Sequence, residues 1–116
     1  PLVDFMSFGT NDLTQMTYGF SRDDVEASVI KKYIEMDILQ ESPFAQLDAL
    51  GVGKLVQEAI NSSRAINPEI KIGICGEHGG DPTSIRFLAN SGVDYVSCSP
   101  PRIPIARLVC AQESLK

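Results

Sequence analysis

The sequence is short of basic residues, of histidine and of long apolar runs. Its 10 Lys and Arg residues against 15 Asp and Glu residues give a net charge of −5, which argues against nucleic acid or an anionic membrane surface as a partner. No apolar run reaches the roughly 18 residues of a membrane-spanning helix, so no membrane partner is expected. One histidine and three cysteines without C-x-x-C spacing, Cys75, Cys98 and Cys110, are too few for a zinc site or a disulfide framework. Free cysteines favour a reducing compartment, and the cytoplasm is the expected location.

What the sequence contains is the composition of one globular domain. With 116 residues, 43% of them hydrophobic and 22% charged, the chain can bury a core and is too apolar for disorder. Apolar segments at 2–8, 71–75 and 94–98 have the length of strands, and the first is predicted to be buried on both faces because its apolar residues do not alternate. Helices are predicted from Ser21 for roughly three to four turns, over 55–66, over 82–91 and from Pro104 onward. In the second of these helices the apolar stripe is expected to consist of Leu55, Val56, Ala59, Ile60 and Ile66. Strands alternating with helices predict an α/β fold with a parallel sheet.

The expected sheet is too small to stand alone. Three strands leave two open edges, and a (β/α)₈ barrel needs about 250 residues, so this chain could supply only part of a barrel. It begins at Pro1 without a methionine and enters a strand almost at once, which fits a piece of a longer polypeptide. We therefore expect the faces around Phe5 and Ile74 to be partly exposed and the isolated chain to be marginally stable.

Polar residues follow the first predicted strand. The segment from Gly9 to Gln15 offers backbone N–H groups, an amide and a carboxylate, and we interpret it as a turn. Two hypotheses remain open for Asn11 and Asp12. Either they only shape the turn, or Asp12 binds a hard divalent cation while Asn11 and nearby N–H groups hold an anionic substrate.

The second predicted strand ends at Cys75, and a glycine-rich segment from Gly76 to Pro82 follows, in which the backbone can approach a ligand closely. Cys75 is either a small buried apolar residue or a thiol that exchanges a proton with a ligand at the carboxyl end of a strand. His78 has no partner motif for catalysis or zinc, and we expect a hydrogen-bonded loop histidine. Cys98 and Cys110 are expected in the interior.

Three runs of sequence, taken together, resemble the C-terminal end of the pyruvate, phosphate dikinases. They are FGTNDLTQMTYGFSRDD from Phe8, GICGEHGGDP from Gly73 and DYVSCSP from Asp94. Two families with the same barrel, phosphoenolpyruvate synthase and the first phosphotransferase of bacterial sugar uptake, share the NDLTQ stretch but differ after the cysteine, where GEHGGDP is the dikinase form. Pro101 departs from the family, which usually has an aromatic residue there.

The resemblance implies one partial domain over residues 1–116, the C-terminal portion of a pyruvate- and phosphoenolpyruvate-binding TIM (β/α)₈ barrel with its last three βα units. Dikinases interconvert ATP, phosphate and pyruvate with AMP, diphosphate and phosphoenolpyruvate through a phosphohistidine. Carried over residue by residue, Asp12 is a ligand of Mg²⁺, and Gly9, Thr10, Asn11 and Asp12 contact the substrate. Cys75 protonates the enolate carbon when pyruvate forms and removes the proton in reverse.

The resemblance also implies partners. The swivelling phosphohistidine domain and the ATP-binding domain would belong to the same polypeptide, the full-length enzyme would be a homodimer, and in a eukaryote its location could be a chloroplast or another organelle. The glutamate that shares the metal with Asp12 and the phosphate-binding arginines are missing here, so the isolated chain is expected to be inactive. His78 is not the phosphorylated histidine. The competing hypothesis is a non-catalytic ligand-binding module of the same fold, against which the intact Asn11, Asp12 and Cys75 argue.

Overall fold

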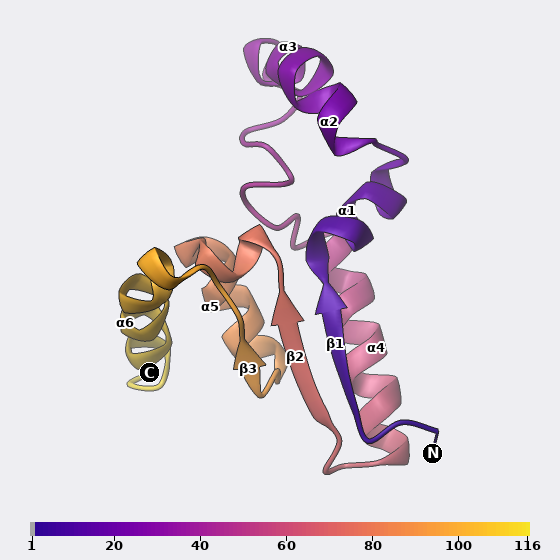
Figure 1. Cartoon of the computed structure of the whole chain (residues 1–116), viewed down its shortest axis with the longest axis vertical. Coiled ribbons are helices and arrows are strands. Elements are labelled where there is room, and N and C mark those ends of the chain that lie inside the picture. Colours follow the sequence, from indigo (N-terminus) through magenta and orange to yellow (C-terminus); the bar gives the residue numbers. More distant parts are fainter. Residues whose placement is uncertain (1) are drawn as a thin grey trace.

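The computed structural model describes residues 2–116 as an α/β fold around a small sheet (Figure 1). The strands are β1 (Phe5–Gly9), β2 (Lys71–Cys75) and β3 (Tyr95–Val96). They lie in the order β1-β2-β3, and both neighbouring pairs are parallel. The register sets Gly9 beside Cys75 and Gly73 beside Tyr95. The predicted parallel sheet is confirmed, and the carboxyl ends of its strands lie at one end of the sheet.

Helical segments fill most of the remaining chain. They are α1 (Thr10–Tyr18), α2 (Arg22–Val25), the π-helical η1 (Glu26–Ile30), α3 (Lys31–Glu35), α4 (Val52–Ile66), the 3₁₀ turn η2 (Glu77–Gly80), α5 (Pro82–Ser91), the 3₁₀ turn η3 (Pro100–Arg102) and α6 (Ile103–Glu113). The arm from α2 to α3 projects away from the sheet, at the top of Figure 1. Helix α5 has the predicted ends: Asp81 accepts the N–H of Ser84 at 2.7 Å, and Gly92 has a φ of 88°.

Residues 10–18 form helix α1, so the predicted turn after the first strand is wrong. Thr10 and Thr14, which are one turn apart, are fully buried, while Leu13 and Tyr18 pack against the core. Gly19, with a φ of 66°, ends the helix. A buried stripe that begins with short polar side chains has almost no hydrophobic periodicity, and for this reason the sequence pattern does not reveal the helix.

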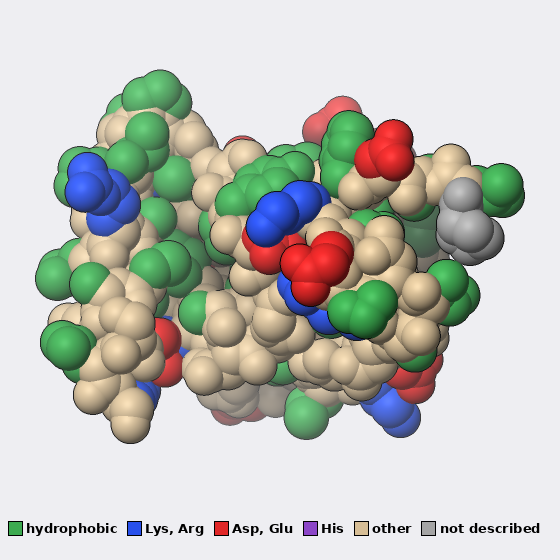
Figure 2. Space-filling view, turned by 90° about the horizontal axis from the view of Figure 1, so that it is seen from below, with side chains coloured by type: hydrophobic (Ala, Val, Ile, Leu, Met, Phe, Trp, Pro, Cys, Tyr) green, Lys and Arg blue, Asp and Glu red, His purple; other side chains and the backbone are tan. Residues whose placement is uncertain are grey.

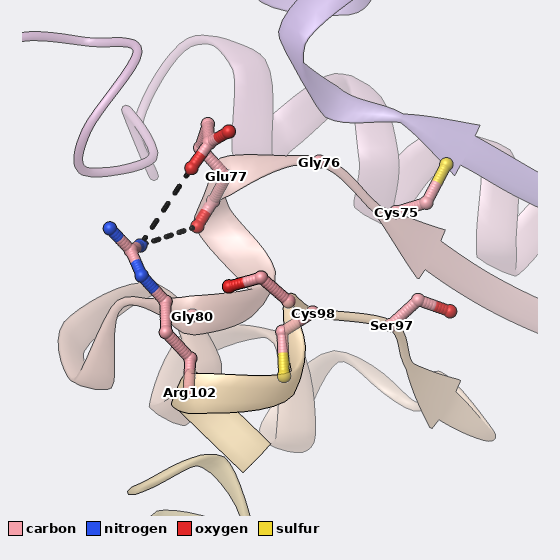
Figure 3. Close-up of a pocket in the computed structure, with 8 residues that line it drawn as sticks. Cys75, Gly76, Glu77, Gly80, Ser97, Cys98 and Arg102 are labelled. Carbon is pink, nitrogen blue, oxygen red and sulfur yellow. Dashed lines mark hydrogen bonds and ion pairs between the residues drawn. The ribbon is translucent and has the colours of Figure 1, made fainter.

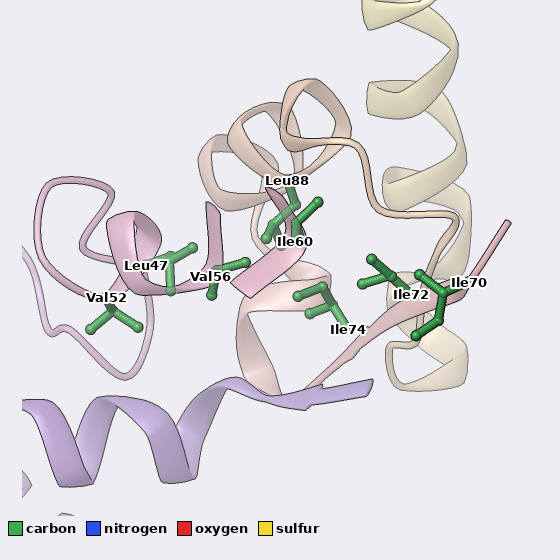
Figure 4. Packing of buried hydrophobic residues seen from close by; sticks show 8 residues of the cluster. All are labelled: Leu47, Val52, Val56, Ile60, Ile70, Ile72, Ile74 and Leu88. Carbon is green, nitrogen blue, oxygen red and sulfur yellow. The ribbon is translucent and has the colours of Figure 1, made fainter. Parts of the chain in front are cut away.

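The main core lies between the sheet and helices α4 and α5 (Figure 4). It consists of Leu47, Val52, Val56, Ile60, Ile70, Ile72, Ile74 and Leu88. On α4 the buried stripe is spaced by four residues, Val52, Val56 and Ile60, whereas Leu55 and Ile66, which we expected on the same stripe, are 43% and 67% exposed. Each large apolar side chain that is fully buried contributes roughly 1.5–3 kcal/mol, so this cluster is the main stabilising contact of the sheet.

The two faces of the sheet have different surroundings. Met6 and Phe8 pack against the core, whereas Phe5 is 64% exposed on the opposite face and Tyr95 is 44% exposed. The prediction that the first strand is buried on both faces is therefore wrong, because α4 and α5 cover only one face. Ile74 alternates toward the covered face and is fully buried, so its expected partial exposure is also wrong, while that of Phe5 is confirmed.

Helices α5 and α6 pack on each other through a second cluster of Ile85, Ala106 and Val109, with Cys98 packed against it. Cys110 follows Val109 and is rotated about 100° from it around α6, so it is exposed and its predicted interior position is wrong. Figure 2, in which α6 lies at the left, shows further hydrophobic side chains at the surface of this helix. None of the helices in residues 2–116 combines the length and the hydropathy that a bilayer-crossing helix requires.

Candidate functional site

The candidate site lies at the carboxyl ends of the strands, where the chain leaves β2 and β3 (Figure 3). A hollow of about 260 Å³ opens there. It is lined by Cys75, Gly76, Glu77, Gly80, Ser97, Cys98, Ser99 and Arg102. Helix α1 begins directly at the end of the neighbouring strand β1, so the segment from Gly9 to Asp12 lies at the same end of the sheet.

The first turn of α1 is joined to the segment that follows β2. Thr10 lies with its hydroxyl oxygen 3.2 Å from the carbonyl oxygen of Cys75, and Asn11 accepts a hydrogen bond from the N–H of Glu77 at 3.2 Å. Gly76 has a φ of 125°, and a Cβ at this position would lie 2.7 Å from the hydroxyl oxygen of Thr10. Only glycine allows this close approach, which sets the positions of the two segments relative to each other.

Asp12 lies in the first turn of α1 and is exposed. Its carboxylate lies over Gly9, since a Cβ on that glycine would be 3.1 Å from Oδ2. The N–H groups of the first helical turn have no carbonyl partner within the helix, so they can bind an anion. The segment therefore presents oxygen ligands of the type that Mg²⁺ prefers and N–H donors side by side. Within residues 2–116 no group of three or more His, Cys, Asp or Glu side chains forms that could hold a metal ion.

Cys75 is exposed at the end of β2, which decides against a buried apolar residue. Its Sγ lies 3.5 Å from the carbonyl oxygen of Phe8 on β1, and in Figure 3 the side chain points toward that strand. The parallel register places Cys75 directly beside Gly9. The thiol, the hollow and the start of α1 are therefore brought together, although Asp12 and Cys75 are 63 positions apart in the sequence.

His78 is fully buried in η2, and each of its ring nitrogens has a partner. Nδ1 lies 2.7 Å from the hydroxyl oxygen of Thr10, and Nε2 lies 2.8 Å from the carbonyl oxygen of Pro43. Burial lowers the pKa of His78, although the Pro43 carbonyl acts in the opposite direction, so the neutral ring is favoured. The predicted hydrogen-bonded histidine is confirmed, but it lies in a 3₁₀ turn instead of a loop.

A charged pair that no sequence motif indicates, Arg102 and Glu77, lies on the far side of the hollow. Nη1 of Arg102 lies 3.8 Å from the carboxylate of Glu77 and 3.5 Å from its carbonyl oxygen. Both side chains are about half exposed, so the ion pair adds little to stability and the guanidinium can move. The position of Arg102 in the sequence is the one feature that indicates a place near the site, because Arg102 follows the third strand just as Asp12 follows the first.

Comparisons with known proteins agree with the sequence motifs. Residues 2–115 match the family model described as "PEP-utilising enzyme, PEP-binding domain". The chain is 59% identical over 110 residues to pyruvate, phosphate dikinase 1, chloroplastic, of Arabidopsis thaliana and to pyruvate, phosphate dikinase 2 of Zea mays. It is 54% identical over 114 residues to pyruvate, phosphate dikinase 2 of Oryza sativa subsp. japonica. These matches cover 95% to 98% of this chain but only 11% to 13% of the relatives, and they bear out the resemblance stated above.

Proposed function

The chain belongs to the PEP-utilising enzymes, and on that premise we propose that it forms the end of the pyruvate- and phosphoenolpyruvate-binding barrel of a pyruvate, phosphate dikinase. The whole enzyme would interconvert ATP, phosphate and pyruvate with AMP, diphosphate and phosphoenolpyruvate. Residues 1–116 would be one partial domain that binds pyruvate or phosphoenolpyruvate and supplies an acid/base group.

The arrangement of the sheet supports the barrel. Parallel neighbours in sequential order, with helices on one face, are the pattern of consecutive βα units in a (β/α)₈ barrel. The uncovered face, which carries the exposed Phe5 and Tyr95, would then be the barrel interior, where the side chains of the missing strands would pack. The candidate site lies at the carboxyl ends of the strands, where active sites of such barrels are found.

Cys75 is the residue that we assign to proton transfer. In the direction of pyruvate formation, the thiol donates its proton to the methylene carbon of the enolate, which becomes the methyl group, and the sulfur is left as thiolate. In the reverse direction the thiolate takes a proton from the methyl group. The observation that carries this proposal is the exposed thiol at the end of β2, beside the first turn of α1 and open to the hollow.

The start of α1 is assigned to binding. Backbone N–H groups of Gly9, Thr10 and Asn11 would orient the anionic substrate, and the Asp12 carboxylate would hold Mg²⁺ together with ligands from the rest of the barrel. When bound, Mg²⁺ supplies positive charge that stabilises the enolate oxygen. Thr10 is fully buried, so its part in binding would come from its backbone and not from its hydroxyl group.

The other partners would come from the same polypeptide and from a second copy of it. A swivelling domain would carry the phosphohistidine, and a further domain would bind ATP. His78 is a poor candidate for the phosphorylated residue, because it is fully buried and both ring nitrogens lie within hydrogen-bond distance of protein atoms. We also propose a homodimer for the full-length enzyme.

The first test separates the two half-reactions in the full-length dikinase that carries this segment. Cys75→Ala should abolish exchange of the methyl protons of pyruvate with solvent while ATP-dependent phosphorylation of the enzyme stays almost intact, because different domains perform these steps. Cys110→Ala, at an exposed position on α6, is the matched control and should change neither reaction. Proton exchange that survives Cys75→Ala would remove Cys75 from the proton-transfer role, whereas absence of exchange in the unsubstituted enzyme would favour a ligand-binding module without this chemistry.

A second test concerns the metal. Asp12→Ala should weaken Mg²⁺-dependent binding of pyruvate strongly, since Mg²⁺ is usually held by only one or two carboxylates. Asp23→Ala serves as control, because it makes the same change in charge at an exposed position on α2, away from the site. An unchanged dependence on Mg²⁺ in Asp12→Ala would remove Asp12 from the binding role.

A further inference from the structure

His78 joins three segments of the chain that are distant in sequence. It belongs to η2, its Nδ1 contacts Thr10 at the start of α1, and its Nε2 contacts the carbonyl of Pro43 in the connection between α3 and α4. Both distances, 2.7 Å and 2.8 Å, are those of good hydrogen bonds. The ring is fully buried, so water cannot replace either partner.

The chemistry of the partners fixes where the protons lie. A backbone carbonyl only accepts, so Nε2 of His78 must carry a proton and donate it to Pro43. Nδ1 of the neutral ring is then an acceptor, and the hydroxyl group of Thr10 donates to it. The carbonyl oxygen of Cys75, at 3.2 Å, is the more distant of the two acceptors that this hydroxyl can reach.

The position of Thr10 affects the candidate site because Thr10 contacts Gly76, which lines the hollow, and because Thr10 belongs to the first turn of α1. Gly76 packs against Thr10 and Asn11 so closely that a Cβ there would lie 2.7 Å and 3.0 Å from their side-chain oxygens. Asn11 in turn accepts the N–H of Glu77. A displacement of Thr10 would therefore move the N–H groups at the start of α1 relative to the end of β2.

We propose that His78 is a positioning residue: it holds Thr10 through Nδ1, and thereby sets the first turn of α1 for substrate binding, while its Nε2 contact with Pro43 serves mainly stability. This inference rests on the proposed function of the site. The imidazole of His78 thus has two roles, one for each ring nitrogen. Asparagine can replace the Nδ1 contact and glutamine the Nε2 contact, so each role can be tested separately.

The test compares His78→Gln with His78→Asn in the full-length dikinase. The longer glutamine amide can reach the Pro43 carbonyl but leaves Thr10 without its acceptor, whereas the shorter asparagine places an amide oxygen near the position of Nδ1 and abandons Pro43. His78→Gln should raise the KM for phosphoenolpyruvate about three- to tenfold, the effect of roughly one neutral hydrogen bond, with kcat within about twofold. His78→Asn should restore the KM while lowering the melting temperature.

Amide hydrogen exchange measured by mass spectrometry provides a readout that does not depend on turnover. A peptide covering residues 8–18 should exchange faster in His78→Gln than in His78→Asn. Thr10→Val should reproduce the effect of His78→Gln, and combining the two changes should add nothing further, because both remove the same hydrogen bond. If a substitution of His78 prevents folding, Thr10→Val alone decides the question, since faster exchange of residues 8–18 in that variant supports the positioning role and unchanged exchange overturns it.

The outcomes separate this inference from the function on which it rests. Equal KM values and equal exchange rates in His78→Gln and His78→Asn, or additive effects of Thr10→Val and His78→Gln, would overturn the positioning role. An unsubstituted enzyme that fails to exchange the protons of pyruvate would overturn the proposed function. In that case the exchange of residues 8–18 still decides whether His78 holds the start of α1.

Discussion

Gly79 and Gly80 are adjacent in η2, and alanine at these two positions should have very different effects. At Gly79 an added Cβ would lie 2.9 Å from Cγ1 of Val96 and closer still to the carbonyl oxygen of Ser97. At Gly80 it would lie 2.9 Å from Nη1 of Arg102 and closer still to Cδ of the same side chain. The distances of closest approach are similar at the two positions, but the atoms that would have to move differ. At Gly79 they include backbone atoms of the segment that follows β3, whereas at Gly80 they belong to the flexible, half-exposed side chain of Arg102.

The magnitude follows from what can move. In Gly79→Ala, η2 and the end of β3 must separate by roughly 1 Å, and overpacking of this kind costs about 1–3 kcal/mol or more. In Gly80→Ala, Arg102 can rotate away and gives up an ion pair worth about 0–1 kcal/mol. Alanine also lowers the entropy of the unfolded chain, which returns about 0.4–1 kcal/mol at both positions. We expect a difference of about 2 kcal/mol, or roughly 30-fold in the ratio of folded to unfolded protein.

The assay is urea denaturation of the 116-residue chain and its two variants, followed by circular dichroism at one protein concentration. Gly79→Ala should shift the midpoint to clearly lower urea and should also disturb the hollow, because Gly80 and Ser97 line it. Gly80→Ala should stay near the unsubstituted chain. If Gly80→Ala is as destabilising as Gly79→Ala, the distinction between backbone and side-chain crowding is wrong.

Three further predictions concern stability. Ile74→Ala, at a fully buried position, should lower the free energy of unfolding by about 2–5 kcal/mol, whereas Ile66→Ala at a 67% exposed position should change it by less than about 0.5 kcal/mol, as measured by urea denaturation. Burial lowers the pKa of His78 below its ordinary 6.5, so below about pH 6.5 the unfolded chain takes up a proton that the folded chain does not. The free energy of unfolding should therefore fall as the pH drops below about 6.5, and a flat profile between pH 7 and 5 would contradict this. Burial, the hydrogen bond to Asp48 and the charge of Asp48 raise the pKa of Tyr18 to about 12. The free energy of unfolding should therefore fall as the pH rises from about 10 to 12, and unfolding curves of Tyr18→Phe at alkaline pH should lack this decrease.

Much of the site could be located from the sequence because chemistry at a parallel sheet collects where strands end. Asn11, Asp12 and Cys75 were each identified as residues that follow or end a strand, and the structure sets the thiol directly beside the segment that leads into α1. The role of His78 could not be read in this way. Its partners, Thr10 and Pro43, are 68 and 35 residues away, and no local pattern connects them.

The predictions about the fold that are wrong have a common cause, which is that tertiary contacts, and not the polarity of a residue alone, decide which side chains are buried. The sequence pattern predicts a turn where α1 forms, because the buried stripe of this helix contains Thr10 and Thr14 in place of apolar residues, and only tertiary contacts bury those threonines. The apolar character of Cys110 and Leu55 predicts interior positions. In the structure the adjacent residues, Val109 and Val56, point toward the core, and Cys110 and Leu55 lie at the surface.

The sequence by itself determined the order of the strands and of the helices that follow α1, the parallel sheet and the family, because alternating patterns, proline and glycine at helix ends and contiguous motifs are local properties of the chain. Only the tertiary structure decided which face of the sheet is covered, that Phe5 is exposed and Ile74 is not, and that His78 contacts Thr10 at the start of α1. Burial and hydrogen-bond partners depend on which segments meet in space, and these meetings join residues dozens of positions apart.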